Sequence, residues 1–263
     1  MAIELTGGCT VSGLREGAAA SEGEVRIWQH AGRAQGAAAI SLRVLELPQG
    51  RSLVGGSACD EVLYVLDGAG KLGERELEAD TGIYLAPNVR ASIECPRPMT
   101  LVSSRCPDPD EPAGHSEGSA AGARPPSAGG QAASAAGRRG AVVAESAPVV
   151  VRLSDCISEM TGDRWYRVLL DHHIGNSRVT QFVGSIPPGR APDHYHEYEE
   201  VLCILAGRGR MWAGDKSTPI ERGSCVYLPR RQVHCVENTG DSELRLLGVF
   251  HPSGSPAVRY AAP

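Results

Sequence analysis

The stretch that decides the fold runs from Pro187 to Gly209 and reads PPGRAPDHYHEYEEVLCILAGRG. His194 and His196 stand at positions i and i+2, and Glu200 follows at the start of the apolar run VLCIL. Side chains at i and i+2 of an extended segment point to one face, roughly 6.5 Å apart at the backbone, so two such imidazoles can bind one ion. The apolar run predicts a buried strand directly after them.

A second stretch completes the predicted site. It runs from Gly223 to Asn238 and reads GSCVYLPRRQVHCVEN. Its histidine adds a third imidazole, and imidazoles with one carboxylate suit a divalent transition metal better than calcium or magnesium, which favour oxygen ligands. We therefore expect one mononuclear metal centre with four ligands: His194, His196, Glu200 and His234.

Together the two stretches resemble the paired motifs of the cupin superfamily, G-x5-H-x-H-x3,4-E-x6-G and G-x5-P-x-G-x2-H-x3-N. Two positions depart from that pattern: four residues rather than five separate Gly189 from His194, and Arg231 stands where the second motif has glycine. Neither position supplies a ligand. The resemblance implies that the four ligands lie in the mouth of a small β-barrel of the jelly-roll type.

An earlier stretch repeats the first motif without most of its ligands. PQGRSLVGGSACDEVLYVLDGAG, from Pro48 to Gly70, aligns with the stretch quoted first. The residues that match the ligands are Gly55 for His194, Ser57 for His196, Glu61 for Glu200 and Ser92 for His234. Glycine and serine offer no imidazole, so the first half resembles a degenerate cupin kept for packing, dimerisation or shaping the cavity. The whole chain resembles a bicupin with one metal site.

The predicted fold class is all-β, because the apolar segments are short and punctuated by Gly and Pro. The resemblance implies two jelly-roll β-barrel (cupin) domains, and a length of 263 residues suits two small barrels. Residues 107–140 contain no Val, Ile, Leu, Met, Phe, Tyr or Trp and are rich in Ala, Gly, Ser and Pro. Such a segment cannot recover its ordering entropy by burial, which predicts a disordered linker. The predicted units are 1–106 (degenerate cupin domain), 107–141 (flexible linker) and 142–263 (metal-binding cupin domain).

Charge and hydropathy exclude several classes of partner. The net charge is −5 and no basic stripe is present, so we expect no nucleic acid. No apolar run approaches the roughly 18 residues of a membrane span, so we expect no membrane partner. The amino terminus shows no export signal, which predicts a cytoplasmic protein whose eight cysteines are reduced. The expected partner is a small-molecule substrate, and a homodimer is compatible with the degenerate half.

Several further residues are candidates for the substrate pocket. Tyr198 shares the strand parity of the ligands, so with Glu200 it is a candidate catalytic residue, although packing at the rim is an equal alternative. Gln181 precedes the motif on a predicted strand, where cupins often place a polar pocket residue. Arg190 and Arg231 flank the two motifs, where they would bind a carboxylate or phosphate or else lie exposed in loops.

Three functions fit this pattern. An open three-histidine, one-glutamate site with Fe(II) or Mn suits an oxygenase acting on a small polar metabolite, which we favour because the second half offers few acid or base residues besides the ligands. The same site, with Ni or Zn also compatible, suits an isomerase, lyase or cyclase that uses the metal as a Lewis acid. The third function is a non-catalytic binding protein.

Overall fold

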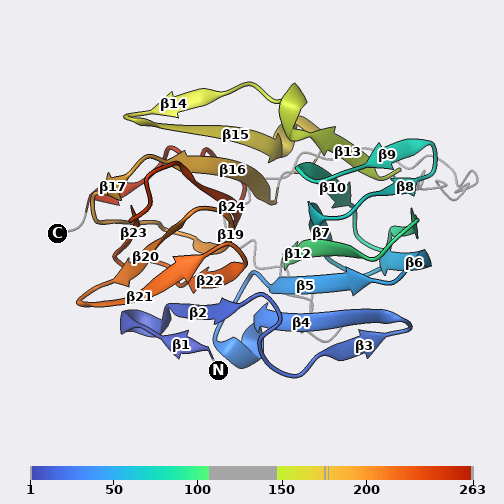
Figure 1. Ribbon diagram of the computed structural model, residues 1–263, viewed down its shortest axis with the longest axis horizontal. Helices are drawn as coiled ribbons and strands as arrows, with labels where there is room; N and C mark the ends of the chain where they lie inside the picture. Colours follow the sequence, from blue (N-terminus) through green and yellow to red (C-terminus); the bar gives the residue numbers. More distant parts are fainter. Residues whose placement is uncertain (1, 107–146, 175, 177, 262–263) are drawn as a thin grey trace, which may run out of the picture.

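The structure, a computed structural model, describes residues 2–106, 147–174, 176 and 178–261 (Figure 1). The predicted linker, residues 107–141, lies outside the described residues and stays a prediction. The described helices are single turns of 3-10 helix: η1 (Thr6–Gly8), η2 (Arg33–Gln35), η3 (Leu153–Asp155) and η4 (His172–Ile174). All other regular structure in these ranges is strand, which confirms the all-β class. None of the described helices has the length and apolar character that a membrane span requires.

The second barrel, which carries the cupin motifs, consists of two facing sheets. Its larger sheet contains, in spatial order, β1 (Ile3–Glu4), β2 (Thr10–Gly13), β22 (Ser224–Leu228), β19 (Glu199–Ala206), β24 (Leu244–His251), β16 (Thr180–Ile186), β15 (Arg164–Leu170) and β14 (Glu159–Thr161). Its smaller sheet contains β21 (Lys216–Glu221), β20 (Arg208–Ala213), β23 (His234–Asn238), β18 (His194–Tyr195) and β25 (Tyr260–Ala261), with β17 (Gly189–Arg190) also paired to β23. Apolar side chains from both sheets fill the space between them, among them Phe182, Leu202 and Val236.

The first barrel repeats this plan with fewer strands. Its larger sheet contains β13 (Val149–Arg152), β10 (Thr81–Leu85), β7 (Asp60–Asp67), β12 (Met99–Cys106), β5 (Leu42–Leu47), β4 (Val25–Ala31) and β3 (Ala20–Glu22). Its smaller sheet contains β6 (Gly50–Gly55), β11 (Arg90–Cys95), β8 (Gly70–Leu72) and β9 (Arg75–Leu77). The interior is apolar, with Leu63, Val65 and Ile93 at its centre. Two jelly-roll barrels are thus present, as predicted.

The two barrels exchange edge strands, which the sequence did not predict. β2 pairs with β22 of the second barrel, where Val11 lies opposite Val226, and β13 pairs with β10 of the first barrel, where Val151 lies opposite Gly82. Figure 1 shows the blue β2 beside the orange β22. The predicted boundaries 1–106 and 142–263 therefore do not coincide with the barrels at these two segments. Each exchanged strand covers a sheet edge whose unpaired backbone groups would otherwise be open.

The two larger sheets pack against each other through a shared apolar core. Val62 and Tyr64 of the first barrel and Val201, Cys203 and Leu247 of the second belong to one cluster of buried side chains. The central strand β19 is consequently buried on both faces, since one face points into its own barrel and the other to the partner barrel. A strand covered on both faces needs apolar residues at nearly every position, which explains the unbroken run in VLCIL.

Candidate metal centre

Three histidines meet at one end of the second barrel. His194 lies on β18 directly opposite His234, the first residue of β23, and His196 follows β18. The ring centroids lie 4.5 Å apart for His194 and His234, 5.0 Å for His194 and His196, and 5.3 Å for His196 and His234. One nitrogen from each ring lies within 4.8 Å of the other two. The antiparallel pairing of two short strands thus brings together residues that are 40 positions apart.

Each of the three rings is held in a fixed orientation by a hydrogen bond from its Nδ1 to a backbone carbonyl oxygen. Nδ1 of His194 lies 2.9 Å from the carbonyl oxygen of Pro192, and Nδ1 of His234 lies 2.8 Å from that of Gln232. Nδ1 of His196 lies 3.0 Å from the carbonyl oxygen of Val258. A carbonyl only accepts, so each Nδ1 carries the proton and each Nε2 keeps a free lone pair. These carbonyl oxygens orient the imidazoles and fix their tautomer, as hydrogen-bond partners of metal-binding histidines do.

The surroundings keep these imidazoles neutral. Burial, and after it the neighbouring His194, lower the pKa of His196 to about 4. Burial and the same neighbour lower the pKa of His234 to about 3. The pKa of His194 is also lowered, first by burial. A metal ion binds only unprotonated imidazole, so this donor set is ready for a divalent cation near neutral pH.

Glu200 lies next to the three histidines at the start of β19. Its Oε2 is 3.7 Å from Nε2 of His196, and the side chain is buried. Burial raises the pKa of Glu200 to about 8, because the charged form is poorly solvated there. A nearby dication would stabilise the carboxylate. Three converging Nε2 atoms therefore fit a divalent transition metal, whereas Glu200 stands outside the group of three donors and its part as the fourth ligand stays a prediction.

The histidines open into a cavity of about 110 Å³. Its wall is mostly apolar, with Phe182, Leu202 and Leu246 among the lining residues. Two arginines, Arg164 and Arg259, are its cationic residues among those described. The volume of the cavity is well below the roughly 300 Å³ of the smallest pockets for drug-sized ligands. The cavity therefore suits a ligand with few heavy atoms.

The two cavity arginines were missed by sequence reasoning. Arg164 begins β15, and its Nε lies 3.6 Å from the Asp163 carboxylate without a hydrogen bond to any described residue. Burial lowers the pKa of Arg164, but a guanidinium stays protonated at any ordinary pH. Arg259 is exposed at the rim, and its positive charge helps to lower the pKa of both His194 and His196. Both arginines are far from the two motifs in sequence, so no spacing pattern marks them.

Tyr198 faces the barrel interior but does not line the cavity. Its ring stacks on His196 at 4.7 Å between centroids and on Phe250 at 4.3 Å. The phenol oxygen is buried, and no described residue hydrogen-bonds to it. The strand-parity argument therefore gave the right face, yet the ring lies behind His196 as a packing partner. This placement does not support a catalytic phenol.

Gln181 points away from the predicted pocket. On β16 the cavity is lined from Phe182 onward, whereas Gln181 is fully buried on the other side, toward the first barrel. A Cβ atom built on Gly82 of the first barrel would lie only 2.7 Å from Oε1 of Gln181. The expectation of a pocket residue is thus not supported, because successive residues of a strand face opposite sides and Gln181 has the interface parity.

The two predicted pocket arginines also lie outside the cavity. Arg190 stacks on Trp212 at 4.3 Å and its Nη2 donates to Asp193 at 3.0 Å. Arg231 donates from Nε to Glu197 at 2.8 Å and is 72% exposed. Its φ of 62° explains why the cupin motif has glycine here, since the left-handed region favours glycine. Both side chains are thus exposed outside the cavity, Arg231 in a loop as the alternative expected and Arg190 on the short strand β17.

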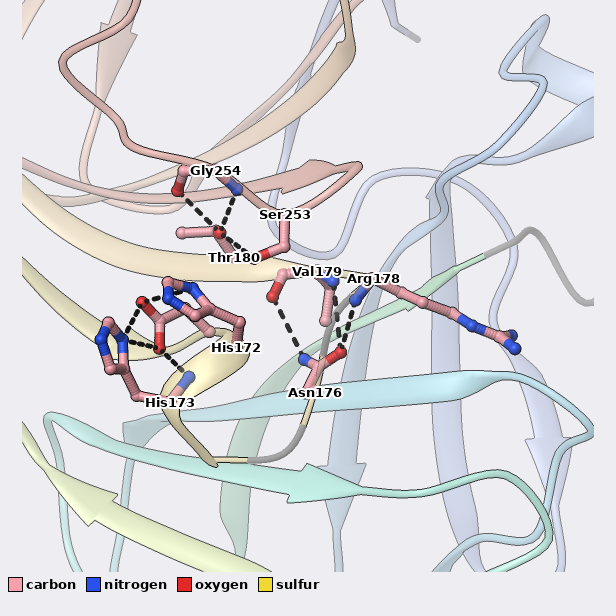
Figure 2. Close-up of polar contacts among 9 residues, drawn as sticks. His172, His173, Asn176, Arg178, Val179, Thr180, Ser253 and Gly254 are labelled. Carbon is pink, nitrogen blue, oxygen red and sulfur yellow. Dashed lines mark hydrogen bonds and ion pairs between the residues drawn. The ribbon is translucent and has the colours of Figure 1, made fainter.

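A second group of metal-type ligands lies on the turn between β15 and β16, away from the cavity (Figure 2). Nδ1 of His173 lies 3.0 Å and Nδ1 of His172 3.5 Å from Oδ2 of Asp171. The side chains of His172 and His173 are 62% and 77% exposed. Nearby, Asn176 caps the turn by accepting a hydrogen bond from the backbone of Arg178. These histidines carry no part of the candidate metal centre.

The first barrel holds a buried ion cluster at the position that corresponds to Glu200. Glu61 lies opposite Leu85 as Glu200 lies opposite Leu228. Its carboxylate accepts hydrogen bonds from Arg43 Nη2 and Ser103 Oγ, both at 2.7 Å, and from Arg105 Nε at 3.0 Å. Two guanidinium groups thus compensate the Glu61 carboxylate. Its counterpart in the second barrel, Glu200, lies beside the candidate metal position instead.

The other positions matched to metal ligands hold no imidazole or carboxylate: they are Gly55, Ser57, whose hydroxyl donates to the carbonyl oxygen of Cys59, and Ser92. A Cβ atom on Gly55 would meet the carbonyl oxygen of Val89 at 2.5 Å and Leu85 Cδ1 at 2.7 Å, so this space is filled. Ser92 is exposed and pairs with Leu53. It is therefore not the spatial counterpart of His234, because a strand register is set by pairing and not by the spacing from a shared proline.

Comparison with known proteins gives the same family. The sequence model of the family described as Cupin domain matches residues 182–250. An oxalate-binding protein from Thermotoga maritima is 36% identical over 116 residues, which cover 40% of this chain and 96% of that protein.

Two solved structures extend the likeness to both barrels. The protein Ylba from E. coli has a TM-score of 0.68 at 12% identity, over 98% of this chain and 96% of that chain. A mutant oxalate decarboxylase from Bacillus subtilis has a TM-score of 0.67 at 13% identity, over 95% of this chain and 78% of that chain. Identities this low show the fold alone. With its second half matched in sequence and both halves matched in fold, the chain belongs to the cupin superfamily, as a protein with two cupin domains.

Proposed function

We propose that this protein is a metal-dependent enzyme that acts on a small carboxylate. The observation that carries the proposal is the convergence of three Nε2 lone pairs beside two guanidinium groups in one small cavity. His194, His196 and His234 would hold the ion, with Glu200 as the fourth ligand. A bound divalent metal supplies Lewis acidity and, if it is Fe(II) or Mn, redox chemistry at open coordination positions.

The arginines determine the expected charge of the substrate. A guanidinium binds a carboxylate through two parallel hydrogen bonds, and it does so most strongly where water is excluded. Arg164 has a buried Nε with no hydrogen bond to a described residue, and its ion pair with the exposed Asp163 carboxylate is loose at 3.6 Å, which leaves the guanidinium able to bind an anion in the cavity. Arg259 adds a second positive charge at the rim. The name of the relative that is 36% identical, an oxalate-binding protein, supports a carboxylate of few heavy atoms.

The reaction class that we propose is oxygenation. The cavity wall offers few groups that could move a proton: Tyr166 donates its hydroxyl proton to Glu159 at 2.7 Å, and the arginines stay protonated. Glu200 is then the one described carboxylate lining the cavity. A scarcity of acid and base residues favours chemistry centred on a redox-active metal over proton transfer by side chains.

A second candidate function is supported by Glu200 itself. Its pKa, raised to about 8 by burial, allows the carboxyl to hold a proton near neutral pH. It also stands outside the group of three donors that lie within 4.8 Å of one another. A carboxyl that can give or take a proton beside a Lewis acid suits an isomerase, lyase or cyclase.

The test loads the purified full-length protein separately with Fe(II) and with Zn and measures turnover of a panel of small mono- and dicarboxylates. The oxygenase proposal requires activity with Fe(II), dioxygen uptake that matches product, and no turnover with Zn, which has no redox chemistry. Equal turnover with Zn under anaerobic conditions would establish the second candidate. Stoichiometric ligand binding with no turnover under any condition would leave a binding protein.

A matched pair of variants tests the substrate class. Arg164→Met should weaken carboxylate binding at least about 10-fold, because one charge-assisted bidentate pair contributes roughly 1.5–3 kcal/mol. Arg231→Met removes an arginine of equal charge outside the cavity and should leave binding unchanged. Equal affinities in the two variants would refute a role for Arg164 in anion recognition.

A further inference from the structure

Glu199 extends from the metal-binding barrel into the first barrel. Neighbouring residues of a strand face opposite sides, so Glu200 points to the cavity while Glu199 points into the interface between the barrels. The residue is only 5% exposed. A buried carboxylate needs strong partners, and here the first barrel supplies most of them.

The loop that follows η2 in the first barrel binds this carboxylate with its backbone. The backbone N–H of Ala38 donates to Oε1 at 2.8 Å and that of Ala39 donates to Oε2 at 2.8 Å. The hydroxyl of Tyr227 lies 3.0 Å from Oε1 and 3.3 Å from the carbonyl oxygen of Gly36, and it donates its single proton to the nearer, charged acceptor. Two successive backbone N–H groups form a concave anion site, and hydrogen bonds to a charged acceptor are about twice as strong as neutral ones. The contact is therefore a strong and directional link between barrels.

The same short segment carries the support of the metal centre. Glu199 lies between Tyr198, whose ring stacks on His196, and Glu200, which lies 3.7 Å from His196. Phe250, which stacks on Tyr198, is also the partner of Glu200 in the strand register. A shift of the backbone at Glu199 would therefore displace both neighbours relative to His196.

We propose that Glu199 is a positioning residue through which the first barrel sets the geometry of the metal centre. The inference rests on the metal centre assigned above, but it requires neither a particular substrate nor a particular reaction. It assigns a task to the barrel that lacks metal ligands: its loop at Ala38 and Ala39 fixes the start of β19, on which Glu200 stands.

The test measures metal affinity of full-length variants by competition with a chelator, together with the electron paramagnetic resonance spectrum of bound Mn(II). Glu199→Gln keeps the size of the side chain but replaces one acceptor oxygen by an NH2 group that opposes the backbone donors. Loss of a group that orients a metal ligand lowers metal affinity by about 10- to 100-fold. We expect the lower figure, about 10-fold, because Glu199 acts on His196 only through its neighbours Tyr198 and Glu200. The Mn(II) spectrum should change as well, since it reports the symmetry of the ligands. Tyr227→Phe removes one of the three hydrogen bonds to Glu199 and keeps the two from the backbone. Its loss of metal affinity should therefore be smaller, about 3-fold.

Arg245→Met is the matched control. Arg245 of the second barrel forms an ion pair with Asp80 of the first barrel at 3.1 Å, and it does not line the cavity. The Arg245→Met variant breaks this contact between the barrels and leaves the segment around Glu199 unchanged. Its metal affinity and Mn(II) spectrum should therefore match those of the unaltered protein.

Each outcome separates the inference from the proposed function. If the unaltered protein binds no stoichiometric metal, the proposed metal-dependent function is refuted, and the positioning role of Glu199 with it. A normal metal site in the unaltered protein and an equal affinity and spectrum in Glu199→Gln would overturn the positioning role alone. An equal loss in Arg245→Met would also overturn it, because the cause would be a loosened interface. If Glu199→Gln fails to fold, Tyr227→Phe decides, and an unchanged affinity there overturns the role.

Discussion

Replacing Glu61 by glutamine should destabilise the protein strongly without affecting its metal site. The side chains of Glu61 and Arg43 are 1% and 5% exposed, and their ion pair is 2.7 Å long. Glutamine would present an NH2 group to donors of Arg43 or Arg105 and remove the negative charge that both guanidinium groups contact. Breaking a buried ion pair from one side costs roughly 3–5 kcal/mol. At roughly 2 °C per kcal/mol for a protein of this size, Tm should fall by about 6–10 °C.

The assay is thermal and urea unfolding of full-length protein saturated with chelator, so that metal binding does not contribute. The matched control is Glu76→Gln, which removes an exposed ion pair with Lys71 whose side chains are 59% and 56% exposed. Exposed pairs contribute roughly 0–1 kcal/mol, so Tm should change by at most about 2 °C. A Tm change in Glu61→Gln no larger than that of Glu76→Gln would refute the reasoning that the two guanidinium groups depend on this carboxylate.

Three further predictions concern the second barrel. His234→Ala should abolish stoichiometric binding of a divalent metal while Ser57→Ala keeps it, as elemental analysis would show; full occupancy in His234→Ala would exclude the assigned centre. Burial raises the pKa of Glu200 in the folded state from 4.5 to about 8. As far as this carboxyl is concerned, the folded protein is therefore most stable below about pH 4.5, where the group is protonated in both states, and that stability is lost as pH rises through 8. Glu200→Gln cannot ionise, and urea unfolding of metal-free protein should show it more stable than the unaltered chain by roughly 5 kcal/mol at pH 9 and by much less at pH 5; equal stability at both pH values would contradict the burial argument. Gln181→Met should leave carboxylate affinity unchanged by titration calorimetry and should raise unfolding stability by roughly 1 kcal/mol, since the buried amide hydrogen-bonds to no described residue; a large loss of affinity would return Gln181 to the pocket.

Local spacing in the sequence was sufficient for the features that depend on neighbours along the chain. The i, i+2 histidines predicted a shared strand face, and the apolar run after them predicted the central strand β19. The repeat at Pro48 to Gly70 predicted that the first half of the chain forms a barrel of its own without imidazole ligands. The strand register confirms the match of Glu61 with Glu200. These inferences hold because strand parity is fixed by backbone geometry, whatever the strand packs against.

The tertiary structure decided the features that depend on distant segments. Strand parity could say that Gln181 and its neighbour face opposite sides, but only the packing of two large sheets decides which side is the cavity. Arg164 and Arg259 reach the cavity because β15 and the segment before β25 close its wall, which no local pattern encodes. The exchange of β2 and β13 has the same origin: an open sheet edge accepts whichever extended segment lies near it, and that proximity is a property of the assembled fold.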